Sequence, residues 1–278
     1  MIKRGKKAMK NLKIAALIIA AAAGIQTFAG CGKKSDTSSP VNAETSAKSS
    51  NAPVVGGTEL SGDNYDKEAY YNKITEKVNN AKVDDKVLVL GSVKKDVITP
   101  EEGAEDAELG AYRVTGDGIK VYFDDASFKE ENVLTLAKYF MSFSAADYNT
   151  YQKCIMPSYV TEMDAFLQKE YQYDLKTSFA KQCSNIADKM YGDYSITRIK
   201  IEPAPKYAED KENLDTYFKS LSDIFGKDYY EQVKGESDEI VDACFYVMGE
   251  DAYGREQMIV SGYEIVFAVK DGKYYTFG

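Results

Sequence analysis

Two long apolar stretches near the end of the chain constrain its fold more than any other feature. These stretches are DEIVDACFYVMG (238–249) and QMIVSGYEIVFAV (257–269). In each, apolar residues occur on both faces of the predicted β-strand. A turn signal, Asp271-Gly272, then leads into a short strand, KYYTF. Two long strands and a short terminal one predict an antiparallel meander with a face that is covered by helices.

The segment before these strands has apolar residues at helical spacing. Ser127-Phe-Lys-Glu130 has the form of a capping box and predicts a helix start. The helix that follows carries an apolar stripe at Val133, Leu136, Ala137, Phe140 and Met141. Further helices are predicted near 146–155, 161–172, 174–191 and 211–226, and a strand is predicted at 194–202.

Residues 63–126 are predicted to form a small N-terminal α+β lead-in. A helix is expected over 65–80, a strand over 86–93, and a hairpin over 111–123 around Asp117-Gly118. The acidic residues 100–109 are expected to form a solvated loop. None of these elements carries a residue pattern of known chemistry.

The order of elements in residues 127–278 resembles the NTF2-like (cystatin-like) α+β family. A helix with LAKYFMSFSAADYNTYQKCIMP (136–157), further helices, a strand and a terminal meander follow one another as in that family. The resemblance implies an α+β fold in which helices pack on a curved antiparallel sheet, the NTF2-like cone. In that family the sheet wraps an apolar cavity that binds small ligands, hosts an active site in some members, or mediates dimers. This chain has an additional helix over 211–226 and lacks the His or Asp/His pair of many catalytic members, which puts catalysis in doubt.

The N-terminus has the layout of a secretory signal. Residues 1–13 contain six basic residues and no acid, and the apolar run 14–29 is shorter than the roughly 20 residues of a membrane-spanning helix. Phe28-Ala29-Gly30-Cys31 resembles the lipobox of bacterial lipoproteins, which usually has Leu where Phe28 stands. The resemblance implies that 1–30 is a signal peptide and that diacylated Cys31 anchors the chain in membrane lipid, on the outer face of the cytoplasmic membrane. The alternative is an ordinary secretory signal with a chance cysteine.

Residues 31–62 are predicted to be the lipidated cysteine and a flexible tether. The stretch is rich in Ser, Thr, Ala and Asn and has too few large apolar residues to offset the entropy of ordering. Such a tether spans roughly 30 Å, which holds a domain clear of the lipid headgroups. The predicted division of the chain is therefore 1–30, 31–62, 63–126 and 127–278.

Charge and composition exclude several classes of function. The formal net charge is −9, or −15 without the six cations of residues 1–13, so we expect no nucleic-acid partner. The absence of histidine excludes Ser-His-Asp and Cys-His catalysis and the usual zinc and iron sites, and we expect no metal and no cofactor. Cys154 and Cys183 could pair outside the cell, whereas the apolar pattern around Cys183 and Cys244 favours small buried side chains.

The candidate ligand-binding residues are Tyr246, Tyr263 and Glu264. The chain has 22 tyrosines and no tryptophan, and tyrosine combines an apolar ring with a hydroxyl that suits sugars or peptides. The competing interpretation is that tyrosine fills the core in place of tryptophan. Glu264 interrupts an apolar strand beside Gly262, so it either acts as an acid or cation ligand on a concave sheet, or faces solvent at a bulge. Asp242 on the neighbouring strand allows the same two interpretations.

The sequence favours a non-enzymatic module that binds a small molecule, a glycan or a peptide outside the membrane. The alternative is an accessory or assembly subunit of a membrane or cell-envelope protein complex, which a flat exposed apolar patch would favour. A third hypothesis is an enzyme that uses carboxylates and tyrosines alone, such as a glycosidase. It requires two carboxyl groups about 5–10 Å apart in a cleft.

Overall fold

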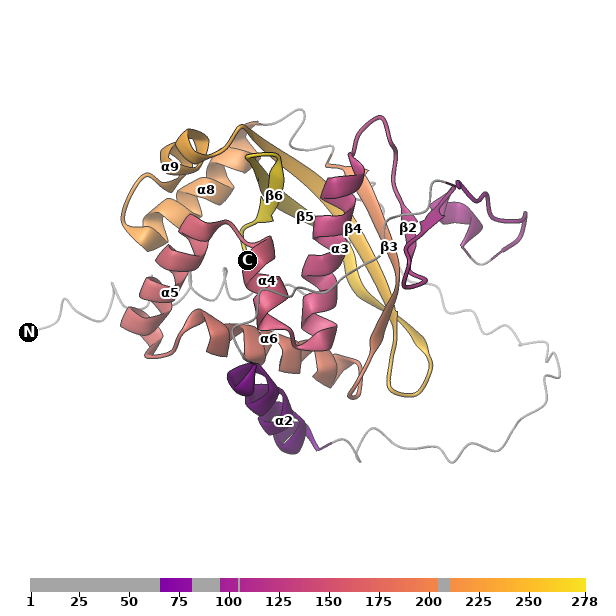
Figure 1. Cartoon of the computed structure of the whole chain (residues 1–278), viewed down its shortest axis with the longest axis horizontal. Coiled ribbons are helices and arrows are strands. Elements are labelled where there is room, and N and C mark those ends of the chain that lie inside the picture. The colour runs from indigo at the N-terminus through magenta and orange to yellow at the C-terminus, as the bar shows by residue number, and fades with distance from the viewer. Residues whose placement is uncertain (1–65, 82–95, 105, 205–210) are drawn as a thin grey trace, which may run out of the picture.

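The chain has an α+β fold, as the sequence predicted (Figure 1). The computed structural model describes residues 66–81, 96–104, 106–204 and 211–278. Within these ranges, seven α-helices pack with a curled sheet of six strands, an arrangement consistent with an NTF2-like cone. The helices are α2 (Lys67–Asn80), α3 (Glu130–Ala145), α4 (Tyr148–Cys154), α5 (Pro157–Tyr171), α6 (Leu175–Lys189), α8 (Lys211–Phe225) and α9 (Tyr229–Glu236).

The strands lie in the sheet in the same order as in the sequence, from β1 to β6. They are β1 (Arg113–Val114), β2 (Lys120–Tyr122), β3 (Ser195–Pro203), β4 (Glu239–Glu250), β5 (Glu256–Lys270) and β6 (Lys273–Thr276). The predicted meander of β4, β5 and β6 is confirmed, but β2 runs parallel to β3, so the sheet is mixed and not wholly antiparallel. Parallel neighbours need a long crossover connection, and helices α3 to α6 provide it.

The long β4–β5 hairpin contains a bulge at Gly262. Phe245 pairs with Tyr263 and Tyr246 pairs with Ser261, which leaves Gly262 as the extra residue. Gly262 has a φ of +63°, a conformation that glycine adopts without steric cost, and a Cβ built there would lie 3.5 Å from the Tyr246 hydroxyl. Such a bulge bends its strand and increases its twist, which contributes to the curl of the sheet.

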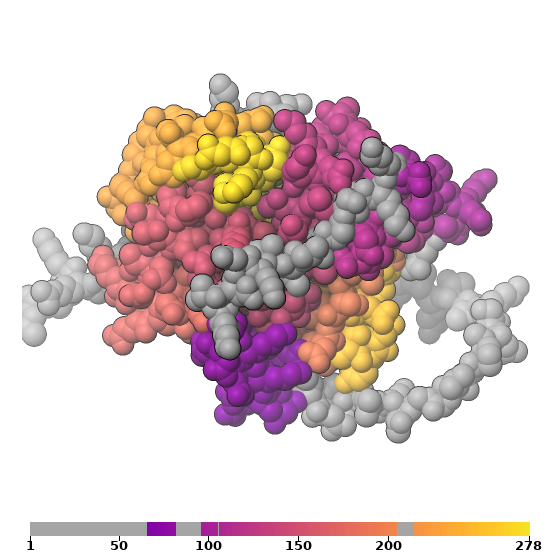
Figure 2. Space-filling model, in the orientation of Figure 1, coloured from indigo at the N-terminus to yellow at the C-terminus, as the bar shows by residue number. Residues whose placement is uncertain are grey.

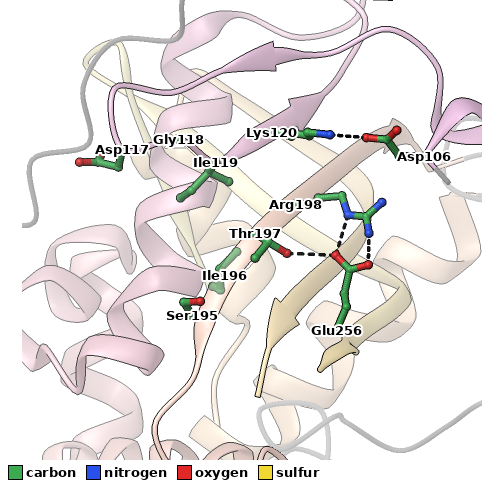
Figure 3. Close-up of a pocket in the computed structure, with 10 residues that line it drawn as sticks. All are labelled: Asp106, Asp117, Gly118, Ile119, Lys120, Ser195, Ile196, Thr197, Arg198 and Glu256. Carbon is green, nitrogen blue, oxygen red and sulfur yellow. Dashed lines mark hydrogen bonds and ion pairs between the residues drawn. The ribbon is translucent and has the colours of Figure 1, made fainter. Parts of the chain in front are cut away.

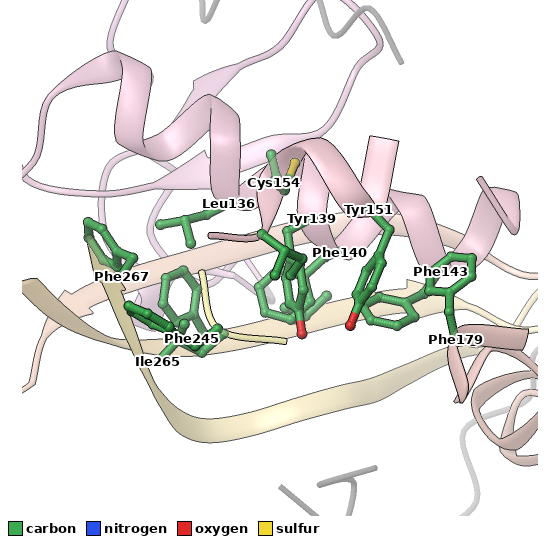
Figure 4. Close-up of a cluster of buried hydrophobic side chains, with 14 of the residues drawn as sticks. Leu136, Tyr139, Phe140, Phe143, Tyr151, Cys154, Phe179, Phe245, Ile265 and Phe267 are labelled. Atoms are coloured by element: carbon green, nitrogen blue, oxygen red, sulfur yellow. The ribbon is translucent and has the colours of Figure 1, made fainter. Parts of the chain in front are cut away.

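Aromatic side chains fill the space between the helices and the sheet (Figure 4). The ring of Phe140 on α3 lies 5.6 Å from that of Phe245 on β4, and the ring of Tyr151 lies 4.5 Å from that of Phe179 (both between centroids). Tyr139 and Tyr151 are buried, and burial raises the pKa of both hydroxyls well above the usual value. At these positions tyrosine therefore serves as a core residue.

Aspartates cap four of the helices. The carboxylate of the residue before the helix accepts the backbone N–H three residues later in α2, α4, α6 and α9, from Asp66, Asp147, Asp174 and Asp228. The predicted capping box at α3 is wrong, because the Ser127 hydroxyl donates to Asp124 at 2.9 Å. The backbone N–H groups of Ser127 and Phe128 also donate to the Asp124 carbonyl, so 124–128 form a turn and the helix begins at Glu130.

Helix α2 and the predicted hairpin around Asp117-Gly118 join the same core as the later elements. α2 packs against α6, where the Lys67 ammonium lies 2.7 Å from the Asp188 carboxylate. The hairpin forms β1 and β2 at one edge of the sheet. Ile74 and Val121 belong to one continuous buried cluster with residues of α3 to β6.

A few local predictions differ from the structure. The acidic segment 100–109 is not wholly solvated, because Asp106 is buried. Helix α9 was not predicted, since only Tyr229 and Val233 on it are buried. Cys154 and Cys183 are buried and form no disulfide. The predicted strand 86–93, the signal peptide, Cys31 and the tether lie outside the described residues.

Candidate functional site

The three predicted binding residues lie on two different faces of the sheet. Tyr263 pairs with Phe245, which is fully buried under the helices, so Tyr263 lies on the helix-covered face. Tyr246 and Glu264 follow the opposite alternation and lie on the other face, where Glu264 pairs with Cys244. The structure therefore brings Tyr246 and Glu264 to one face and separates both from Tyr263.

Asp242 shares the outer face of the sheet with Glu264. Burial raises the pKa of Asp242 to about 6, and the negative charge of Glu264 adds to this rise, while a backbone hydrogen bond opposes it. One carboxylate oxygen of Asp242 is buried and has no hydrogen-bond partner within the described ranges. A charge at this position is therefore costly to the fold.

A groove of about 930 Å³ lies between α3, the α4–α5 junction and β6. We call it the lysine groove, because it is lined by Lys138, Lys153 and Lys273. Ile155, Val160 and Tyr275 supply apolar surface, and Glu131 is the one acidic residue among the described residues of the lining. Figure 2 shows β6 (yellow) beside α3 (magenta) on the near face of the molecule. The volume is within the range of about 300–1,000 Å³ that is typical of ligand sites.

The three lysines reach the groove from three different elements. Lys138 lies seven residues after Glu131, on the same face of α3. Lys153 stands in the last turn of α4, where the helix C-terminus favours a cation. Lys273 follows the turn at Asp271 and Gly272, whose φ values of +52° and +68° suit a two-residue hairpin. The local structure explains why a lysine is accommodated at each of these positions, and the fold brings the three positions together.

The groove is basic although the chain is acidic. Three lysines and one glutamate line it in the described part of the chain, whereas the whole chain has a formal charge of −9. No carboxylate of the described residues forms an ion pair with Lys138 or Lys273. Lys138 is half-buried, so part of its side chain is already shielded from water. Hydrogen bonds to charged groups contribute about 1.5–3 kcal/mol each, so an anion in the groove would gain from these ammonium groups.

Cys154 also lines the groove, but its thiol is unsuited to nucleophilic chemistry. The residue is buried, and burial raises the pKa of the thiol to about 12, although the positive charge of Lys138 opposes the rise. The thiolate is the reactive form of cysteine, and a thiol with this pKa stays protonated at neutral pH. The groove thus offers ammonium groups, hydroxyls and apolar surface, which are means of binding.

A second hollow of about 510 Å³, the charged pocket, lies where β2 and β3 meet the start of β5 (Figure 3). The Lys120 ammonium lies 2.6 Å from the Asp106 carboxylate, and the Tyr122 hydroxyl donates to the same carboxylate at 2.7 Å. The Arg198 guanidinium donates to both carboxylate oxygens of Glu256. Each cation here has a carboxylate partner, so the charged pocket holds ion pairs of the fold and offers little charge to a ligand.

Sequence reasoning did not find the groove lysines. They lie on a polar helix face, at a helix end and after a turn, which are ordinary solvent positions for lysine, and Lys273 is far from the other two in the chain. The turn at Asp271-Gly272 was predicted and does place Lys273 at the start of β6. No local pattern indicates that Lys138 and Lys153 face the same strand.

No family model, curated protein or solved structure matches the chain. In the part of the chain that the structure describes, no three His, Cys, Asp or Glu side chains are grouped so that they could hold a metal ion. The helices of that part are all too short or too polar to cross a bilayer. The ligand of the groove is therefore inferred from the groove's own residues.

Proposed function

We propose that this chain is a non-enzymatic binding module that holds an anionic ligand in the lysine groove. The observation that carries the proposal is the convergence of Lys138, Lys153 and Lys273 on one groove of an acidic protein. Lys138 and Lys273 have no carboxylate partner among the described residues, so their positive charges repel one another, and a bound anion relieves that repulsion. The apolar surface of Ile155 and Tyr275 suits the carbon skeleton of a ligand that carries carboxylate or phosphate groups.

The proposal includes display on the outer face of the bacterial cytoplasmic membrane. The lipobox-like Phe28–Cys31 supports anchoring through diacylated Cys31, since two acyl chains give stable attachment. In a bacterial host grown with labelled palmitate, the wild type is expected to incorporate the label and Cys31→Ala is expected to incorporate none. A wild type without label would contradict the anchor.

Calorimetric titration of the full-length protein with citrate and with pyrophosphate tests the groove. Binding is expected to weaken as salt rises and to weaken at least tenfold, or about 1.4 kcal/mol, in Lys138→Gln/Lys273→Gln. The matched control is Lys181→Gln/Lys219→Gln, which removes the same charge from two exposed positions outside the groove. Equal losses in the two double variants would show that only the overall charge matters, and the proposed function would then be wrong.

A further inference from the structure

The free edge of β6 faces the lysine groove. The Thr276 carbonyl accepts the backbone N–H of Met156 at 2.9 Å, so the polar backbone groups of Thr276 point away from β5. Residues two apart in a strand direct these groups to the same side. Tyr274 therefore directs its N–H and C=O to the side on which Met156 lies, and Tyr274 itself lines the groove.

Within the described residues, the chain covers this edge at one residue only. Ile155 forms a single parallel bridge to Thr276, because α4 ends at Cys154 and α5 begins at Pro157. No other described segment donates a hydrogen bond to the backbone of Tyr274 or accepts one from it. With respect to the described residues, the edge at Tyr274 thus has an open donor and an open acceptor, which are the groups that an added strand uses.

The side chains around the open edge favour a ligand with negative charge. Lys273 directly precedes Tyr274 on the strand, and Lys138 on α3 and Lys153 on α4 line the same groove. Ile155 and Val160 add apolar surface to the same hollow. Because alternate side chains of an extended peptide point to opposite faces, a segment that alternates acidic and apolar residues can satisfy both kinds of surface.

We propose that the lysine groove binds an extended acidic segment of another protein, which adds to β6 as a short strand. Its main chain hydrogen-bonds to Tyr274, in line with the Ile155–Thr276 bridge, and its carboxylates contact Lys138, Lys153 and Lys273. The inference rests on the proposed function and names the class of ligand. A small anion uses the lysines alone, whereas a peptide uses the lysines and the strand edge together.

Fluorescence anisotropy of labelled hexapeptides with the full-length protein tests this inference. The probe is Glu-Val-Glu-Val-Glu-Val, about 20 Å long when extended, and Lys-Val-Lys-Val-Lys-Val is the charge control. Two further versions of the acidic peptide carry N-methyl groups on all valine nitrogens or on all glutamate nitrogens. Successive N–H groups of a strand point to opposite edges, so only one of these two sets faces β6.

The acidic peptide is expected to bind, and the basic peptide is not. One N-methylated version is expected to bind like the parent, and the other at least tenfold more weakly. Lys138→Gln/Lys273→Gln is expected to lose at least tenfold in affinity, while Lys181→Gln/Lys219→Gln retains it. If the two N-methylated versions bind equally, strand addition is wrong. Binding of citrate without binding of the peptide overturns this inference and leaves the proposed function standing, and binding of neither overturns both.

Discussion

The lysine groove and the charged pocket contain the same kinds of side chain in opposite arrangements. In the charged pocket, Lys120 and Arg198 each contact a carboxylate from another segment of the chain. In the lysine groove, Lys138 and Lys273 have no such partner among the described residues. A cation that is satisfied within the fold contributes to its stability, whereas a cation that is left open is available to a ligand.

The two sites also differ in what holds their residues in place. The ion pairs of the charged pocket connect the segment around Asp106 to β2, and β3 to β5, so they contribute to the packing of those segments. The groove lysines lie on α3 and β6, whose positions are fixed by aromatic packing and by pairing with β5. Stability should therefore depend on the charged pocket, and binding on the lysine groove.

The largest effect on stability is expected for Asp106→Ala. The substitution leaves the buried Tyr122 hydroxyl without its acceptor and Lys120 without its ion pair. A loss of about 2–3 kcal/mol in the free energy of unfolding is expected, measured by urea denaturation. Asp106→Asn keeps an acceptor oxygen for Tyr122 and should lose roughly half as much. A loss below about 0.5 kcal/mol would show that the charged pocket is not structural.

The contribution of Asp106 should also depend on pH. The hydrogen bond from Lys120, and then the one from Tyr122, lower the pKa of its carboxyl in the folded state. A carboxyl group whose pKa is lowered on folding stabilises the fold at pH values above its pKa in the unfolded state, about 3.9. This stabilisation is lost as the pH falls through the pKa of the group in the folded state. The difference between the wild type and Asp106→Asn should therefore be constant from pH 5 to 7 and shrink below about pH 4. A difference that grows on acidification would contradict the assignment.

The sequence predicted the parts of the fold that depend on local pattern. The β4–β5 hairpin could be predicted because both strands have apolar residues on both faces. The apolar stripe from Val133 to Phe140 predicted α3. The parallel pairing of β2 with β3 has no local signal, since the long crossover through α3–α6 determines it. Asp106 was assigned to solvent because it stands in an acidic run, and only its distant contact with Tyr122 explains its burial.

Candidate sites were harder to predict for the same reason. The bulge at Gly262 was a local feature and is present, but adjacent residues of β5 alternate between the faces, so Glu264 lies with Tyr246 on the face opposite to Tyr263. Which face a strand residue occupies depends on the register of the whole sheet, and a single extra residue reverses it. The groove lysines depend on contacts of α3 and α4 with β6, which lies more than 100 residues later in the sequence.

A smaller loss of stability is expected for Glu256→Gln in the charged pocket. The substitution removes the charge that pairs with Arg198, whose side chain is only 13% exposed. A loss of about 1 kcal/mol is expected in the same urea measurement. Glu239→Gln, at an exposed position at the start of β4, is the control and should change stability by less than about 0.5 kcal/mol. Equal effects would mean that the Arg198–Glu256 pair contributes nothing measurable.

Asp242→Asn tests a third case, a half-buried carboxylate beside another acid. Burial first, and the charge of Glu264 in addition, raise the pKa of Asp242 to about 6. A raised pKa means that the fold binds this proton more tightly, so wild-type stability falls as the pH rises from about 4 through 6. Asn carries no charge, so the variant should be more stable by about 1 kcal/mol at pH 8, allowing for partial exposure, and equal to the wild type near pH 4. Thermal unfolding at both pH values measures this, and a variant that is less stable at pH 8 would contradict it.

The smallest effect on stability is expected for Lys138→Gln/Lys273→Gln. This double variant is the most direct test of the difference between the lysine groove and the charged pocket. Neither lysine has an ion pair within the described ranges, so the free energy of unfolding should change by less than about 0.5 kcal/mol, with a slight gain from reduced repulsion. The matched comparison is Lys120→Gln in the charged pocket, which should lose about 1 kcal/mol because Asp106 is left without its cation. Urea denaturation of both variants decides the point. A loss above about 1 kcal/mol at the groove would show that its lysines hold the fold together, and the distinction between a structural pocket and a binding groove would then be wrong.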